Sequence, residues 1–221
     1  MPKITDIKKQ KVRPRVNIYL DGKFGFSLNL EDYLKLGLKK DQEIDLNTIP
    51  HILNQDQQKK LFDSALNFLS FRPRSEKEIR DKLWAILKKS RISTSQESLS
   101  DKVHKLIDET VASLKKIGQV DDLQFTLWWI EQRQKFRPKG RMALANELSS
   151  KGIKKEIIDE AFSRGLGEDD LALASKLIDK KKTSFEKLAD FERKKKVASY
   201  LARRGFSWEV INQVLTLIKE E

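Results

Sequence analysis

The sequence contains no cysteine, which excludes disulfide bonds, a thiolate nucleophile and cysteine-based zinc sites. It has only two histidines, His51 and His104, and neither has an acid or nucleophile at the spacing of a catalytic motif. No apolar run approaches the length of a membrane span, and the first residues do not follow the pattern of a signal peptide. We therefore expect a cytoplasmic protein without membrane contact, and one that binds no metal or cofactor.

Glycine and proline are also scarce, with nine and five copies among 221 residues. Alanine, leucine, lysine and glutamate dominate after the first fifty residues, a composition that favours helix. Apolar residues recur at helical spacing, for example at Ile158, Ala161 and Phe162 and again at Ile211 and Val214. We interpret these stripes as core faces and predict an all-α fold with a small β extension at its N-terminus.

The extension, residues 1–50, contains the signal of a β-hairpin. Asp21-Gly22 lies between two stretches rich in β-branched and aromatic residues, and this dipeptide favours a type I′ turn. A two-residue loop places Tyr19 opposite Phe24 as an aromatic cross-strand pair. Because an isolated hairpin is marginal in water, we expect it to pack on the helical body or on a partner.

A short helix follows the hairpin. Asn29 is a suitable N-cap for a helix over residues 30–36, and Gly37 is suited to end it. Residues 43–46 are a candidate for a further strand.

The rest of the chain repeats internally. Phe71–Ser75, with the sequence Phe-Arg-Pro-Arg-Ser, recurs as Phe136–Gly140, and Leu148–Ile153 is matched by Leu201–Phe206. The unit is a helix, a basic turn, a helix, a glycine turn with a left-handed residue, and a last helix. This pattern predicts three tandem three-helix, helix-turn-helix-like repeats over residues 51–108, 109–163 and 167–221.

The three copies differ in detail. The first has a Ser-rich stretch at 90–100 in place of the glycine turn. The third lacks the Phe-Arg-Pro sequence and has Arg193–Lys196 near that position. Gly165–Gly167 is the expected junction between the second and third copies.

The formal net charge is +12, and residues 180–204 hold ten Lys and Arg against three Asp and Glu. Such density attracts phosphates without reading base sequence, although a solvated helix face stays an equal alternative. The hypothesis for partner or DNA binding names the basic residues Arg72, Arg74, Lys77, Arg80, Arg133, Arg137, Lys139, Arg141, Lys180, Lys181, Lys182, Arg193, Lys194, Lys195, Lys196, Arg203 and Arg204.

The phenylalanine that opens each basic turn, Phe71 or Phe136, has two interpretations. It could stack on exposed bases of a single strand, but we favour burial in the core of its repeat, because large apolar side chains are usually buried. The arginines beside it are then expected to reach outward, to phosphate or to a carboxylate of a partner.

Two further groups are interpreted as structural. Asp121-Asp122 lacks a third ligand at useful spacing, so we expect a helix cap and a first-turn acid instead of a metal site. The four tryptophans lie at helical positions and are expected to anchor the core or the contacts between repeats: Trp84, Trp128, Trp129 and Trp208.

At this point three ordered motifs resemble those of a known family, the RecX regulatory proteins. Ile117–Phe125, Trp129–Arg133 and Gly140–Ile153 are similar to its central repeat. Arg72–Leu83 is similar to its first-repeat motif and Tyr200–Phe206 to its third. The similarity covers residues 60–221, and the hairpin segment resembles the N-terminal extension of longer members.

The resemblance implies an elongated, curved stack of three three-helix repeats that binds the RecA filament on single-stranded DNA. It also implies inhibition of RecA ATP hydrolysis, strand exchange and coprotease activity, in recombination, DNA repair and the SOS response. We expect a monomer that binds single-stranded DNA without sequence preference, and binding to double-stranded DNA stays open.

The sequence leaves one other class of function open and argues against another. A helix-turn-helix transcription regulator is the alternative, although its basic residues would be concentrated on one recognition helix, whereas here they are spread over all repeats. An enzyme acting on nucleic acid is not expected, because the sequence has no convergent acid, base or metal-binding cluster and no Gly-rich phosphate loop.

Overall fold

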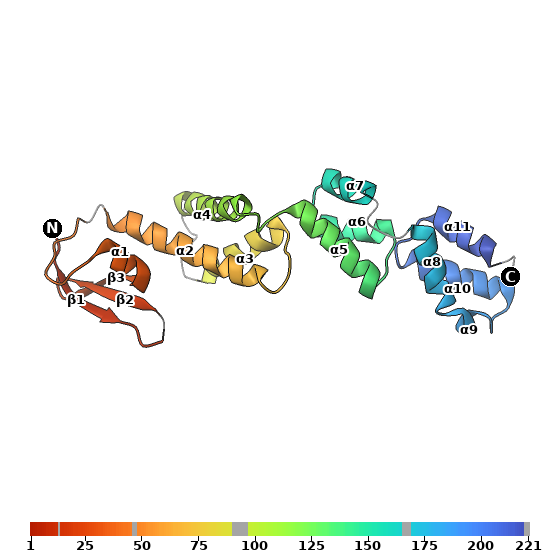
Figure 1. The fold of residues 1–221 in the computed structure, drawn as a ribbon, viewed down its shortest axis with the longest axis horizontal. Helices are drawn as coiled ribbons and strands as arrows, with labels where there is room; N and C mark the ends of the chain where they lie inside the picture. The colour runs from red at the N-terminus through yellow and green to blue at the C-terminus, as the bar shows by residue number, and fades with distance from the viewer. Residues whose placement is uncertain (13, 46–47, 90–96, 165–168, 219–221) are drawn as a thin grey trace. The chain divides into compact units, whose positions relative to one another are not determined.

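The computed structural model describes residues 1–12, 14–45, 48–89, 97–164 and 169–218 (Figure 1). These residues form eleven helices and one three-stranded antiparallel sheet, so the mainly helical fold with a small N-terminal β element is confirmed. The chain divides into two compact units. The first unit comprises Met1–Asn67 and Ile86–Thr110, and the second unit comprises Phe68–Ala85 and Val111–Glu221. None of the described helices has the length and apolar character needed to cross a membrane.

The sheet of the first unit is a meander in the order β1-β2-β3. Its strands are β1 (Ile4–Lys9), β2 (Arg15–Leu20) and β3 (Lys23–Asn29). The predicted hairpin is confirmed: Asp21 and Gly22 have φ values of 48° and 79°, as a type I′ turn requires. Tyr19 pairs with Phe24, with ring centroids 6.0 Å apart and edge to face.

Strand β1 was not predicted. Its sequence, Ile-Thr-Asp-Ile-Lys-Lys, alternates weakly and ends in two lysines, and it gains its conformation by pairing with β2. Of the candidate strand at 43–46, Glu43 forms only an isolated bridge with Lys3, and Leu46 lies outside the described residues.

The helix after the hairpin is α1 (Leu30–Leu36), which packs against β2 and β3. The Asn29 side chain accepts hydrogen bonds from the N–H groups of Glu31 and Asp32, and Gly37 ends the helix with a φ of 59°. Both predicted caps are therefore confirmed.

The next helix, α2 (Ile49–Leu69), is fastened to the sheet through Asp56. The Asp56 carboxylate is 3% exposed and accepts two hydrogen bonds from the Arg15 guanidinium, at 3.1 and 2.9 Å. It also accepts one from the backbone N–H of Asn29 at 3.1 Å. The β extension thus packs on a helix of the body, one of the two expected outcomes.

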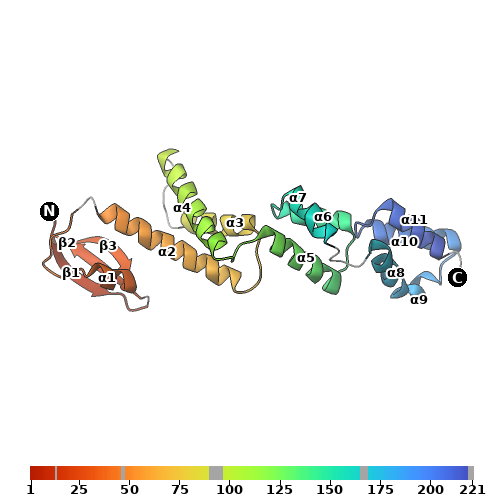
Figure 2. The ribbon, with the colours of Figure 1, turned by 45° about the horizontal axis from the view of Figure 1, so that its top comes forward.

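The remaining helices are α3 (Glu76–Lys89), α4 (Glu97–Lys116), α5 (Asp122–Phe136), α6 (Arg141–Ser150), α7 (Lys155–Ser163), α8 (Asp170–Asp179), α9 (Lys182–Phe185), α10 (Asp190–Ala202) and α11 (Trp208–Leu217). Helices α5, α6 and α7 correspond to the second repeat, and α8, α10 and α11 to the third (Figure 2). Helix α4 crosses the predicted boundary between residues 108 and 109. Residues 90–96 of the Ser-rich stretch and the junction Gly165–Gly167 lie outside the described residues.

Each of these two repeats has its own core. Ile158 and Ala161 are buried in the second with Phe125, Leu144 and Leu148. The core of the third repeat contains Leu173, Val197, Leu201, Ile211 and Val214. The predicted apolar stripes of the second and third repeats are therefore core faces.

Candidate polyanion-binding site

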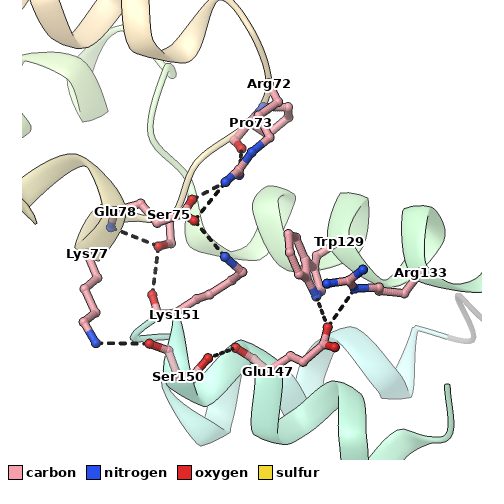
Figure 3. Close-up of polar contacts among 10 residues, drawn as sticks. All are labelled: Arg72, Pro73, Ser75, Lys77, Glu78, Trp129, Arg133, Glu147, Ser150 and Lys151. Atoms are coloured by element: carbon pink, nitrogen blue, oxygen red, sulfur yellow. Dashed lines mark hydrogen bonds and ion pairs between the residues drawn. The ribbon is translucent and has the colours of Figure 1, made fainter. Parts of the chain in front are cut away.

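The candidate site lies where consecutive repeats meet within the second unit. At the first joint, defined by residues 75–78, 122 and 150–152, the start of α3 contacts the second repeat (Figure 3). The Ser75 hydroxyl donates to the Lys151 carbonyl at 2.8 Å, and the Glu76 N–H donates to Asp122 Oδ1 at 2.8 Å. Gly152 has a φ of 81°, and a Cβ there would lie 2.7 Å from Lys77 Cβ. The predicted glycine turn is therefore also a contact between repeats.

The second joint, defined by residues 138–143, 170 and 204–205, repeats this arrangement. The Gly140 N–H donates to the Arg204 carbonyl at 3.0 Å, and the Arg141 N–H donates to Asp170 Oδ2 at 3.1 Å. Gly205 has a φ of 78°, and a Cβ there would lie 2.3 Å from Ala143 Cβ. The two joints thus share one backbone arrangement, in which the N-terminus of a helix contacts the glycine turn of the next repeat.

Paired aspartates serve both joints. Asp121 caps its own helix α5 by accepting from the N–H groups of Leu123 and Gln124, as predicted. Asp122 instead caps α3 of the preceding repeat by accepting from the Glu76 N–H, a role that was not predicted from the sequence. Asp169 and Asp170 divide the same two roles at the second joint. Burial raises the pKa of Asp122 and of Asp170, since each carboxylate leaves water to accept these bonds.

A network of ion pairs surrounds the first joint and holds several candidate binding residues (Figure 3). The Arg72 guanidinium makes two hydrogen bonds to the Glu78 carboxylate, at 3.1 and 3.0 Å, and Lys151 Nζ lies 2.7 Å from the same group. Burial alone would raise the pKa of Glu78, but these cations outweigh it and lower the pKa to about 2.

Glu147 forms the second centre of this network. It accepts hydrogen bonds from the Trp129 indole N–H at 2.9 Å and from Arg133 Nε at 2.8 Å, and it pairs with Lys139. Burial opposes ionisation, but these partners keep the pKa of Glu147 below its ordinary value. Cations of Arg133 and Lys151 lie 4.5 and 4.3 Å from the centroid of the Trp129 ring. Trp129 is therefore an anchor, as predicted.

The expected orientations in the basic turns are wrong in two respects. Phe71 and Phe136 are not buried but 78% and 68% exposed. In the first turn, Arg72 does not reach outward but lies over Trp128 and Trp129, and Arg74 lies 3.8 Å from the Phe68 ring centroid, whereas Arg137 of the second turn is exposed as expected. The guanidinium groups of Arg72 and Arg74 lie over aromatic rings of the neighbouring helices, where cation–π contacts stabilise them. The phenylalanine of each turn remains in solvent. Another expectation also fails, because Trp208 is 64% exposed at the start of α11.

The seventeen candidate residues fall into two groups. The first group contacts other parts of the protein: Arg72, Arg74, Lys77, Arg80, Arg133, Lys139, Arg141, Lys181, Lys182, Arg193, Lys194 and Arg204. The second group is exposed and, within the described part of the chain, has no side-chain ion pair: Arg137, Lys180, Lys195, Lys196 and Arg203.

The second joint carries a groove of about 870 Å³, here called the basic groove. Seven lysines and arginines line it and none of its described lining residues is acidic; the cations are Lys135, Arg137, Lys139, Lys176, Lys180, Arg203 and Arg204. Tyr200 and Arg203 also line a neighbouring groove, which adds Lys181, Lys195 and Lys196 and one acid, Glu192. The basic groove thus brings cations from two repeats together, and they include three of the five exposed candidate residues, Arg137, Lys180 and Arg203.

The first joint carries a groove of a different kind. Four acids line it, Glu76, Asp81, Asp121 and Asp122, and they equal its four cations in number. The described lining is therefore cationic at the second joint and charge-balanced at the first, although both joints share their backbone geometry. The run at 180–204 is visible in the sequence, but Lys135 and Lys176 were not predicted, because only the folded chain places them on the lining of one groove.

Comparisons with known proteins agree with this architecture. The model of the RecX N-terminal domain matches residues 2–45, and models of the first, second and third RecX three-helix domains match residues 62–85, 121–161 and 168–215. The regulatory protein RecX of Bacillus licheniformis is 37% identical over 97% of this chain and 77% of its own length. That of Bacillus subtilis is 36% identical over 100% of this chain and 79% of its own length.

Solved structures give the same result. A crystal structure of a regulatory protein RecX covers 100% of both chains with a TM-score of 0.68 and 27% identity. RecX from Lactobacillus salivarius, at 21% identity and a TM-score of 0.61 over 76% of this chain and 99% of its own, shares the fold. With relatives of this identity over nearly its whole length and four domain models in order along it, the chain belongs to the RecX family of regulatory proteins.

Proposed function

We propose that this protein binds the RecA filament on single-stranded DNA and inhibits RecA ATP hydrolysis, strand exchange and coprotease activity. In this proposal it acts in the cytoplasm, in recombination, DNA repair and the SOS response, as a monomer and without catalysis or a cofactor of its own. The observation that carries the proposal is the basic groove of a RecX-family chain, whose described lining holds seven cations and no acid.

The exposed cations are the binding residues in this proposal, because the others contact carboxylates, carbonyls or rings of the protein itself. Arg137, Lys180 and Arg203 have no internal ion pair among the described residues, so a polyanionic filament meets them at little desolvation cost. Arg72, in contrast, would have to leave Glu78 before it could bind a phosphate.

The test is the ATPase of the cognate RecA on single-stranded DNA, titrated with the protein. Wild type should inhibit at stoichiometric amounts. The double variant Lys180→Gln/Arg203→Gln should inhibit about three- to tenfold less strongly, since an exposed charge contact contributes roughly 1 kcal/mol or less. The matched control Lys154→Gln/Lys155→Gln removes the same charge from exposed residues at the start of α7 and should inhibit like wild type.

Absence of any effect of wild type on RecA would contradict the proposal. Equal inhibition by the double variant and by wild type would place filament binding outside the basic groove. A competition between one duplex and random DNA tests the alternative, because a transcription regulator would prefer its own duplex strongly.

A further inference from the structure

The exposed ring of Phe136 lies in the basic groove and is not needed by the core of its repeat. It ends α5, is 68% exposed and lines the groove with Arg137, Lys180 and Arg203. Lys135 Nζ lies 5.5 Å from the centroid of the ring. An exposed phenyl ring lacks the stabilisation that burial of its apolar surface would give. An exposed ring beside cations therefore suits a ligand that has negative charge and a flat apolar face.

The first repeat provides an internal comparison. Phe71 occupies the equivalent place in its basic turn and is 78% exposed. The two arginines of that turn are engaged elsewhere, because Arg72 binds Glu78 and Arg74 lies over Phe68. The turn therefore offers a ring without available cations, whereas the turn of Phe136 offers both.

We propose that the basic groove binds a single strand of DNA, with phosphates against Arg137, Lys180 and Arg203 and one base stacked on the Phe136 ring. A phosphodiester backbone supplies negatively charged partners for these exposed cations, and an unpaired base supplies a flat apolar face for the ring. A duplex keeps its bases stacked inside, so the ring selects single strands. The groove reads no base edge, and binding is independent of sequence.

A second groove adjoins the basic groove. Tyr200 and Arg203 line both grooves, so a strand that leaves the basic groove at Arg203 meets two further exposed cations, Lys195 and Lys196. The half-buried Tyr200 ring contacts two cations, Arg204 at 4.7 Å and Lys181 at 5.2 Å, and packs edge to face with Phe185. The exposed Phe136 ring contacts one cation of the described residues, Lys135, so Tyr200 is not offered as a second stacking surface.

This inference rests on the proposed function only for the choice of DNA as the strand, and its test needs no RecA. The full chain is titrated against three fluorescent probes of equal length, and anisotropy reports binding. The probes are oligo(dT), the same backbone with abasic sites, and a duplex. Oligo(dT) should bind more tightly than either of the other two.

The decisive variant is Phe136→Leu, which keeps an apolar side chain but removes the stacking face. It should weaken oligo(dT) binding by about fivefold or more, from the range measured for base–aromatic stacking, and leave binding of the abasic probe unchanged. Phe71→Leu and Phe191→Leu are controls at rings that are each 78% exposed and outside the groove lining, and they should bind like wild type. Lys180→Gln/Arg203→Gln should lower the slope of log K against log salt by about 1.4, at about 0.7 for each phosphate contact.

Each outcome decides the inference. Phe136→Leu binding oligo(dT) like wild type, or losing affinity for the abasic probe equally, would overturn the stacking role. If wild type inhibits RecA but binds no oligonucleotide, the proposed function stands and this inference fails, and the groove then serves the filament protein. If the DNA results are as expected but RecA is unaffected, the inference stands and the proposed function fails.

Discussion

Replacement of Gly205 by alanine should disrupt the second joint, and it allows backbone strain to be separated from crowding. Gly205 has a φ of 78°, which disfavours any residue with a Cβ. In addition, the new Cβ would lie 2.3 Å from Ala143 Cβ and 2.5 Å from its backbone nitrogen, so α6 would have to move away from the glycine turn.

Gly118→Ala is the matched control. Gly118 follows α4 in the second unit with a φ of 70°, but its added Cβ would meet nothing within 4 Å. The left-handed conformation costs about 1–2 kcal/mol for alanine, and this cost applies to both variants. The forced shift at Gly205 adds about 1–3 kcal/mol, by analogy with overpacked cores. We therefore expect a loss of unfolding free energy of about 1–2 kcal/mol for Gly118→Ala and about 2–5 kcal/mol for Gly205→Ala.

The measurement is urea unfolding followed by helical circular dichroism, combined with amide hydrogen exchange. In Gly205→Ala, faster exchange should be concentrated in the first turn of α6 and around Arg204, where the joint is made. Binding of oligo(dT) should weaken too, because the joint holds both walls of the basic groove. Equal losses of stability in the two variants would refute the idea that close backbone contact fastens the repeats together.

Three further predictions concern other contacts. The ionised Glu78 carboxylate, with a pKa of about 2 against an ordinary 4.5, stabilises the fold above pH 4.5, and this contribution is lost as the pH falls toward 2. Glu78→Gln should therefore lower the unfolding free energy at neutral pH by about 1–2 kcal/mol, discounted for partial exposure, and lessen its decrease in acid; an acid profile like that of wild type would contradict this. Asp56→Asn should cost the first unit about 3 kcal/mol, because Arg15 loses its buried partner, and unchanged hydrogen exchange in β2 and β3 would count against it. A chain lacking residues 1–50 should still melt cooperatively as a helical protein, whereas an unfolded truncation would make the β extension part of the helical core.

Local chemistry made much of the fold predictable. The Asp21-Gly22 turn and the caps Asn29 and Gly37 depend on the conformations of a few neighbouring residues, so their sequences suffice to identify them. Strand β1 escaped prediction because its conformation depends on pairing with β2 and hardly on its own sequence.

The candidate site was predictable only in part. The sequence identified the basic runs, and the exposed Lys180, Arg203 and Arg137 are among its candidates. It could not tell them from Arg72 and Arg74, since a carboxylate or aromatic ring that engages an arginine can come from a distant segment.

The sequence by itself therefore determined the helical class, the repeated unit and its glycine turns, because helix periodicity and left-handed glycines are local properties. The tertiary structure alone decided that Asp122 and Asp170 cap the helix of the preceding repeat, that the phenylalanines of the basic turns point to solvent, and that cations of two repeats share one groove. These features depend on which surfaces meet when the repeats pack, and burial, charge pairing and exposure are set by those contacts between segments far apart in the chain.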